Sequence, residues 1–207
     1  MARIPKLFWF DTETTGTERY RNSMIQLSAL IEIGGEVVEE LNLFFRPLPD
    51  REISQDALDI NGRTLGEIES FPDAADGVAQ LKAAFNRHVK KFDKNDKLVP
   101  AGFNTGFDTD FLRETFFASA ARFPDKKEYG PGSYLFNAAI DVRHLIAEMI
   151  ARKGFRSRNF KLSTCCLELD VPLDNAHDAL ADIRSTRALY YRCMKELGYS
   201  QEAAHAA

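Results

Sequence analysis

Residues 6–16 read KLFWFDTETTG, an apolar run that ends abruptly in a polar segment with two carboxylates. The run from Lys6 to Phe10 predicts a short buried strand, and the segment from Asp11 to Thr17 predicts a turn. Two further apolar-rich runs, Met24 to Ile33 and Val37 to Phe45, are separated by a Gly-Gly pair and predict a hairpin. We therefore expect the chain to open with three strands.

Strand and helix patterns alternate in the rest of the chain. Apolar residues recur at three- and four-residue steps between Pro72 and Lys91, which predicts an amphipathic helix. Three leading strands followed by strand-helix units predict an α/β fold with a mixed central β-sheet flanked by α-helices. The other predicted elements are strands at 98–102 and 138–141 and helices at 107–122, 142–153, 161–169 and 179–197.

Length and composition fit a single globular domain. The 207 residues are 44% hydrophobic and 28% charged, which excludes a disordered chain, a collagen and a small disulfide-stapled protein. Without repeats or a linker, we expect one domain over residues 1–207, with a core from about 4 to 197 and a short C-terminal tail. No run approaches the ~18 to 20 apolar residues of a membrane span or the apolar stretch of a signal peptide. We therefore expect a cytoplasmic protein with no membrane partner.

The cysteines and the net charge agree with this interpretation. Cys165 and Cys166 are adjacent and Cys193 stands alone, a spacing that predicts reduced thiols rather than disulfides or a metal-ligand set. The formal net charge of −4 argues against a phosphate-binding protein only if the charge is spread evenly.

Asp11 and Glu13 are the first candidates for chemistry. In an extended segment residues two apart project to the same side, so the two carboxylates converge where the first strand ends. Their like charges repel, and a divalent cation makes such a pair tolerable at neutral pH. A solvated turn is the simpler alternative. A calcium loop of the EF-hand type is a second one, supported by Gly16 at the sixth position but opposed by Asn22 at the twelfth, where a glutamate is needed.

Two further clusters lie near predicted helix starts. Asp108 is near the start of a helix, where an aspartate by itself is most often a cap. His177 and Asp182 are five residues apart, about 140° on a continuous helix, so we expect His177 before the helix or in its first turn and Asp182 inside it. Asp178 is a competing candidate for any carboxylate role there.

In this order, D-x-E, then Asp, then H-x-x-x-x-D resemble the DEDDh 3′-5′ exonucleases of the DnaQ-like, ribonuclease H-like superfamily. The resemblance extends over about residues 4 to 195. One departure is Phe103, because the family often has a histidine at that position before the second-motif asparagine. The segments that carry the resemblance are 11–16, 104–112, 140–141, 160–162 and 177–182.

The resemblance implies a ribonuclease H-like sheet and a set of site residues. Asp11, Glu13, Asp108 and Asp182 would bind two divalent cations, and His177 would be the general base. Two ions about 3.5 to 4 Å apart stabilise charge on the attacking and leaving oxygens of a phosphodiester. Oxygen ligands suit Mg²⁺ or Mn²⁺, and the absence of a Cys/His set argues against zinc. A histidine with a pKa of ~6.5 is largely neutral at pH 7 to 8 and can accept a proton.

The resemblance also implies residues that bind substrate. Backbone N–H groups of Thr14, Thr15 and Gly16 would approach the terminal nucleotide, with a plain turn as the alternative. Asn104 either positions substrate or holds the strand-to-helix turn, and the sequence leaves both open.

The implied activity is a 3′-5′ exonuclease that releases nucleoside 5′-monophosphates from single-stranded nucleic acid. DNA is favoured over RNA, because the D-T-E-T-T-G wording is shared most closely with proofreading members, which also implies a role in DNA repair and a polymerase or replication partner. An exoribonuclease of RNA turnover or maturation is the nearest alternative, and a catalytically silent nucleic-acid-binding module is another. The oligomeric state stays open.

A basic run lies just before the third motif. Residues 149–167 contain no acidic side chain and carry a local charge of +5. Such a run either holds a nucleic-acid backbone or forms a solvated loop. Its members are Arg152, Lys153, Arg156, Arg158 and Lys161.

The aromatic residues carry no assigned function. Most of the sixteen phenylalanines, including Phe44, Phe85 and Phe111, are expected in the core, so no base-stacking residue is named. The segment from Phe123 to Phe136 predicts a long loop beside the second motif.

Overall fold

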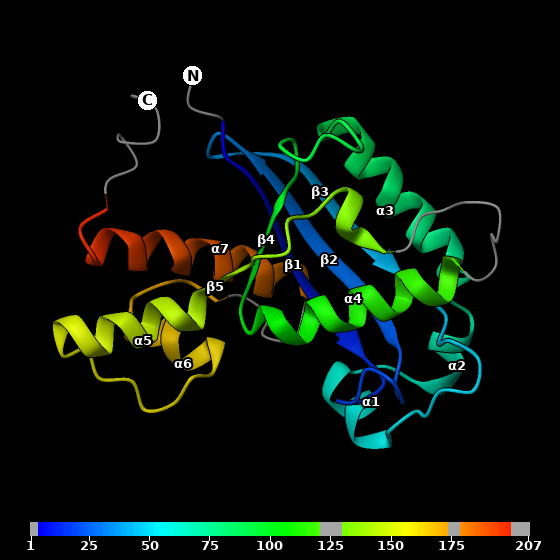
Figure 1. The fold of residues 1–207 in the computed structure, drawn as a ribbon. Coiled ribbons are helices and arrows are strands. Elements are labelled where there is room, and N and C mark those ends of the chain that lie inside the picture. Colours follow the sequence, from blue (N-terminus) through cyan, green and yellow to red (C-terminus); the bar gives the residue numbers. More distant parts are fainter. Residues whose placement is uncertain (1–3, 121–129, 174–178, 200–207) are drawn as a thin grey trace.

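A computed structural model describes residues 4–120, 130–173 and 179–199. Within these ranges the chain forms a mixed five-stranded sheet with seven α-helices around it (Figure 1), which confirms the α/β class.

The sheet has the order β3-β2-β1-β4-β5. β1 (Lys6–Thr14) lies at the centre, antiparallel to β2 (Met24–Ile33), which pairs in turn with β3 (Glu36–Phe44). On its other side β1 is parallel to β4 (Val99–Gly102), and β4 is parallel to β5 (Ile140–Asp141). The carboxyl ends of β1, β4 and β5 therefore meet at one edge of the sheet.

The first strand is longer than the sequence predicts, and the expected turn over 11–17 is wrong in its first half. β1 continues through Asp11 and Glu13, which pair with Ser28 and Gln26 of β2. The register shifts only between Glu13 and Thr14. The long β2 offers backbone partners to these polar residues, and ladder hydrogen bonding outweighs their turn propensity. Both carboxylates thus lie on a fixed strand.

Alternating side chains of β1 pack into two different cores. Phe8 and Phe10 join the core beneath α3 (Ala74–His88) and α4 (Thr105–Ala120), where Phe85 and Phe111 are also buried. Leu7 and Trp9 join the opposite core, which the last three helices cover. Those helices are α5 (Val142–Lys153), α6 (Leu162–Glu168) and α7 (Ala179–Glu196). The period of two along β1 therefore places helices on both faces of the sheet.

The three cysteines are free and buried in the core beneath α5, α6 and α7, as the sequence predicts. Burial raises the pKa of the Cys166 thiol to about 12, which keeps it protonated.

Of the three phenylalanines expected in the core, Phe85 and Phe111 are buried there and Phe44 is only half-buried.

Two helices and one turn were not predicted. α1 (Gln55–Asn61) and α2 (Leu65–Glu69) are short, and each buries a single apolar side chain. A short 3-10 helix, Pro131–Ser133, precedes Tyr134, whose ring lies 5.3 Å from that of Phe85 and is 1% exposed. The second half of the expected loop over 123–136 thus contains a 3-10 turn, and Tyr134 and Leu135 of this half belong to the core. Residues 121–129 lie outside the described ranges.

Candidate active site

Four carboxylates from three elements come together where β1 ends. Asp11 and Glu13 lie on β1, Asp108 in the first turn of α4, and Asp182 in the first turn of α7. The Asp11 carboxyl lies within electrostatic reach of the other three. The fold thus unites residues that are 171 positions apart in the sequence (182 − 11).

Asp108 is fixed by a direct link between α4 and the sheet. It is 2% exposed, and its Oδ1 accepts hydrogen bonds from the backbone N–H of Thr12 at 3.0 Å and the Thr12 hydroxyl at 2.7 Å. Burial raises the pKa of Asp108 to about 7, although these two hydrogen bonds act in the opposite direction. Loss of water is therefore the dominant influence on this carboxyl.

Asp11 is the carboxyl on which the charges of the other three act. Burial raises its pKa well above the ordinary value, and the charges of Asp108, Glu13 and Asp182 raise it further. An oxygen-only cluster of this sort is the donor set that divalent cations such as Mg²⁺ prefer, and a bound cation would restore the ionised form.

The cluster is not closed around one ready-made metal position. Among the residues that the structure describes, no group of three or more His, Cys, Asp or Glu side chains already has the geometry to hold an ion. The charges of Asp108, Glu13 and Asp182 nonetheless reach the Asp11 carboxyl.

The residues after the carboxylate pair are engaged in holding the end of β1. The Thr14 hydroxyl donates to the Gly16 carbonyl at 2.6 Å, and the backbone N–H of Thr15 donates to the Ser23 carbonyl at 2.8 Å. A side chain at Gly16 would lie 2.5 Å from Asn22, so close packing requires glycine there. The Thr15 N–H is therefore bonded within the protein, while the substrate-binding role of this turn stays a prediction.

Asn104 holds the turn between β4 and α4. Its backbone has a left-handed φ of 67°, its N–H donates to Asp141 Oδ1 at 3.1 Å, and its own Oδ1 accepts from Arg143 at 2.5 Å. Asn104 therefore holds the turn, as one of the two predicted alternatives states. The residue is also exposed. Phe103, at the departure from the family pattern, packs against the core under α5 to α7.

His177 and Asp178 lie outside the described residues, in the segment 174–178. Asp182 is described, and it lies inside α7, which begins at Ala179. The prediction that Asp182 lies inside this helix is therefore confirmed.

Asn61 is a site neighbour that the sequence reasoning missed. Its Nδ2 donates to the Thr14 carbonyl at 2.9 Å, which ties α1 to the end of β1.

The next helix along the chain, α2, does have a sequence signal that marks its start. Thr64 followed three residues later by Glu67 matches a capping box. The Thr64 side chain does accept from the Glu67 N–H at 3.3 Å.

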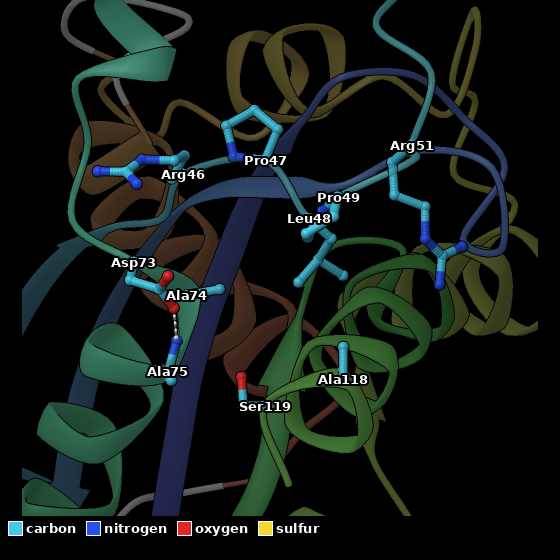
Figure 2. A pocket seen from close by; sticks show the side chains of 10 residues that line it. All are labelled: Arg46, Pro47, Leu48, Pro49, Arg51, Asp73, Ala74, Ala75, Ala118 and Ser119. Carbon is cyan, nitrogen blue, oxygen red and sulfur yellow. Dashed lines mark hydrogen bonds between the residues drawn. The ribbon is translucent and has the colours of Figure 1, made fainter. Parts of the chain in front are cut away.

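A separate cavity of about 310 Å³ lies between the 46–51 segment, the start of α3 and the end of α4. Figure 2 shows the ten residues that line it, and none of the predicted site residues is among them. This cavity is therefore not the candidate site.

Comparisons with known proteins give a consistent family. The RNase_T model, described as "Exonuclease", matches residues 8–190. A DNA polymerase III of PolC type from Oceanobacillus iheyensis is 28% identical over 188 residues, which are 91% of this chain but only 11% of that protein. The chain therefore spans about a ninth of the length of this curated relative.

Solved structures share the fold. E. coli exonuclease I in complex with a dT13 oligonucleotide superposes with a TM-score of 0.69 at 20% identity, covering 92% of this chain and 41% of that one. The zinc-bound form of an E. coli exonuclease I complex with single-stranded DNA gives a TM-score of 0.71 at 20% identity, covering 96% of this chain and 42% of that one.

Across the described ranges, no helix is both long and apolar enough to cross a membrane.

Proposed function

The chain belongs to the exonuclease family, and from that premise we propose that it hydrolyses phosphodiester bonds at the 3′ end of single-stranded DNA. The products would be nucleoside 5′-monophosphates, and residues from about 4 to 197 would act as one exonuclease domain. The observation that carries the proposal is the convergence of four carboxylates from β1, α4 and α7.

Asp11, Glu13, Asp108 and Asp182 would hold two Mg²⁺ or Mn²⁺ ions. When bound, the ions supply positive charge to the attacked phosphate and activate the attacking water. The fit is supported by the donor set, since all four side chains offer oxygen and the charge of each neighbour disfavours ionisation of Asp11.

The protein's own residues would position the reacting groups. Thr12 orients Asp108 through two hydrogen bonds, and the rigid pairing of β1 with β2 fixes Asp11 and Glu13. His177, just before α7 in the sequence, would accept a proton from the attacking water at a ring nitrogen. The water oxygen would form the new bond to phosphorus, and the bond from phosphorus to the 3′ oxygen of the preceding nucleotide would break. That oxygen would leave with the electron pair and take up a proton, which gives the shortened chain its new 3′ hydroxyl.

DNA is the polymer that we propose. The relative from Oceanobacillus iheyensis is named a DNA polymerase, and the two exonuclease I structures are recorded with a dT13 oligonucleotide and with single-stranded DNA. The same relationship supports a proofreading role beside a polymerase partner.

The test is digestion of 5′-labelled DNA and RNA oligonucleotides of one sequence with Mg²⁺, Mn²⁺, Zn²⁺ or EDTA. We expect a ladder that shortens from the 3′ end of DNA with Mg²⁺ or Mn²⁺ and disappears with EDTA. His177→Ala should slow cleavage by about 10²- to 10⁴-fold. Cleavage of RNA alone would refute the preference for DNA. Tight binding without cleavage under every metal condition would indicate a silent binding module instead.

A further inference from the structure

The last turn of α5 and the segment that follows it as far as α6 carry five basic side chains, on a chain whose net charge is −4. Arg152 and Arg158 have side chains that are 68% and 75% exposed, although each contacts a glutamate, Glu148 and Glu168 respectively. The other three basic residues of the run, Lys153, Arg156 and Lys161, are exposed as well.

Phe160 is an exposed aromatic residue that lies between Arg158 and Lys161 in the sequence. It is 46% exposed and follows Arg158 by two residues, whereas Phe155 of the same segment packs against the core under α5 to α7. The segment is ordered by its own hydrogen bonds, including one from the Lys161 N–H to Asn159 Oδ1 at 2.9 Å. An exposed aromatic ring with cations beside it is the usual composition of a surface that binds single-stranded nucleic acid.

The segment leads directly to the carboxylate cluster. α6 follows Lys161 and packs on α7, the helix that carries Asp182. Cys166 of α6 lies within electrostatic reach of Asp182, whose charge contributes to the raised pKa of its thiol. With a rise of 1.5 Å per residue, Lys161 lies only about 7 to 8 Å along the helix from Cys166. The Lys161 end of the basic segment therefore lies toward the cluster, while Arg152 and Lys153 lie at the outer end of α5.

We propose that Arg152, Lys153, Arg156, Arg158, Phe160 and Lys161, here called the α5–α6 surface, bind the single-stranded DNA substrate on the 5′ side of its terminal nucleotide. Phe160 would stack on a base, and the basic side chains would contact backbone phosphates. This inference rests on the proposed function, because the carboxylate cluster receives the 3′ end. A surface of this kind would offset the repulsion between the phosphate backbone and an acidic site.

The test compares kcat/KM for oligo-dT of about 4 and about 16 nucleotides, lengths that bracket common site sizes. Phe160→Ala should reduce the advantage of the long substrate by about fivefold or more, and Phe160→Trp should keep it. Lys161→Glu should also reduce this advantage. The slope of log affinity against log salt concentration should become shallower by about 0.7.

Phe92→Ala is the matched control. Phe92 is 75% exposed and has the Lys91 ammonium 5.0 Å from its ring centre, so its chemistry is similar to that of Phe160. It precedes β4 at the sheet edge opposite to the carboxylates. We expect the Phe92→Ala variant to treat long and short substrates as the wild type does.

Fluorescence anisotropy of the same oligonucleotides in EDTA separates this inference from the proposed function. If the wild type cleaves DNA but Phe160→Ala and Lys161→Glu keep its length preference and affinity, the inference is overturned and the exonuclease stands. If no cleavage occurs but Phe160→Ala still weakens binding of the long oligonucleotide, the surface stands and the exonuclease fails. An equal loss in Phe92→Ala would also overturn the inference.

Discussion

Asp108 is placed by a residue of another element. In the sequence it is indistinguishable from a helix-capping aspartate, because both occur near helix starts. In the structure Thr12 donates twice to its carboxylate, so the side chain is bound to the strand that carries Asp11 and Glu13. Only the tertiary contact separates a cap from a site residue.

The raised pKa of Asp108 predicts how stability depends on pH without divalent ions. Its folded-state value of about 7 lies above the ordinary value of 3.8, so the folded protein holds a proton that the unfolded chain has lost. Stability should therefore fall as pH rises from about 4 to about 7, by the order of 1 to 3 kcal/mol. Urea denaturation in EDTA at pH 5 and pH 8 measures this.

Asp108→Asn is the variant that isolates the effect. The amide oxygen can still accept both hydrogen bonds from Thr12, and it does not titrate. The stability lost between pH 5 and pH 8 should be smaller in this variant than in the wild type. An equal or larger loss in the variant would show that Asp108 is not the titrating group.

At the scale of elements, sequence patterns predict the long amphipathic helices and the short α6, but they miss the short α1 and α2. The predicted helix from Pro72 to Lys91 is observed as α3, within three residues at each end. α1 and α2 bury only Leu58 and Ile68 respectively, and one apolar residue gives no period to detect. For α2 the N-cap Thr64, rather than periodicity, is the readable signal.

α7 is anchored to the sheet by a buried carboxylate that the sequence does not single out. Glu32 of β2 is 2% exposed and accepts from Trp9 Nε1 at 2.9 Å and from Arg187 Nε at 2.7 Å. Because Arg187 lies in the helix that carries Asp182, this network fixes the helix on which one side of the site depends.

Glu32→Ala should destabilise the protein by about 3 to 5 kcal/mol, because it leaves a guanidinium and an indole N–H without their buried acceptor. The matched control is Glu40→Ala, which removes the exposed pair between Glu40 and Arg184 of the same helix. That change should cost less than about 1 kcal/mol. Equal effects in urea denaturation would contradict the anchoring role.

Gly77 of α3 is required by packing. A Cβ there would lie 2.4 Å from the Phe45 ring, whereas one at Gly106 of α4 would meet nothing within 4 Å. Gly77→Ala should destabilise by about 1 to 3 kcal/mol despite the better helix propensity of alanine. Gly106→Ala should be neutral or stabilising by up to about 1 kcal/mol. Thermal unfolding of both variants tests this, and a stabilised Gly77→Ala would contradict it.

At the scale of the whole molecule, the alternation of strands and helices is sufficient to predict the α/β class and the flanking helices. It does not predict that β1 runs on to Thr14, because polar residues in a strand are decided by the partner strand. Nor can spacing show that Asp11 and Asp182 lie close together, since that contact depends on the packing of α7 against β1.

Divalent ions should stabilise the whole molecule if the carboxylates bind them. Mg²⁺ or Mn²⁺ at about 100 times its dissociation constant should add about 2.7 kcal/mol to the free energy of unfolding. The gain should increase with pH through about 7, because ion binding requires Asp108 to lose its proton. A thermal melt with and without Mn²⁺ measures the gain. An equal gain in Asp108→Asn would place the ions elsewhere.

The most direct test of the four-carboxylate site compares Asp182→Asn with Asp178→Asn in cleavage of 5′-labelled single-stranded DNA with Mg²⁺. The two substitutions remove one charge each within the same short stretch of chain. We predict that Asp182→Asn abolishes 3′-end shortening while Asp178→Asn largely retains it. Full activity in Asp182→Asn, or loss confined to Asp178→Asn, would contradict the assignment of the site.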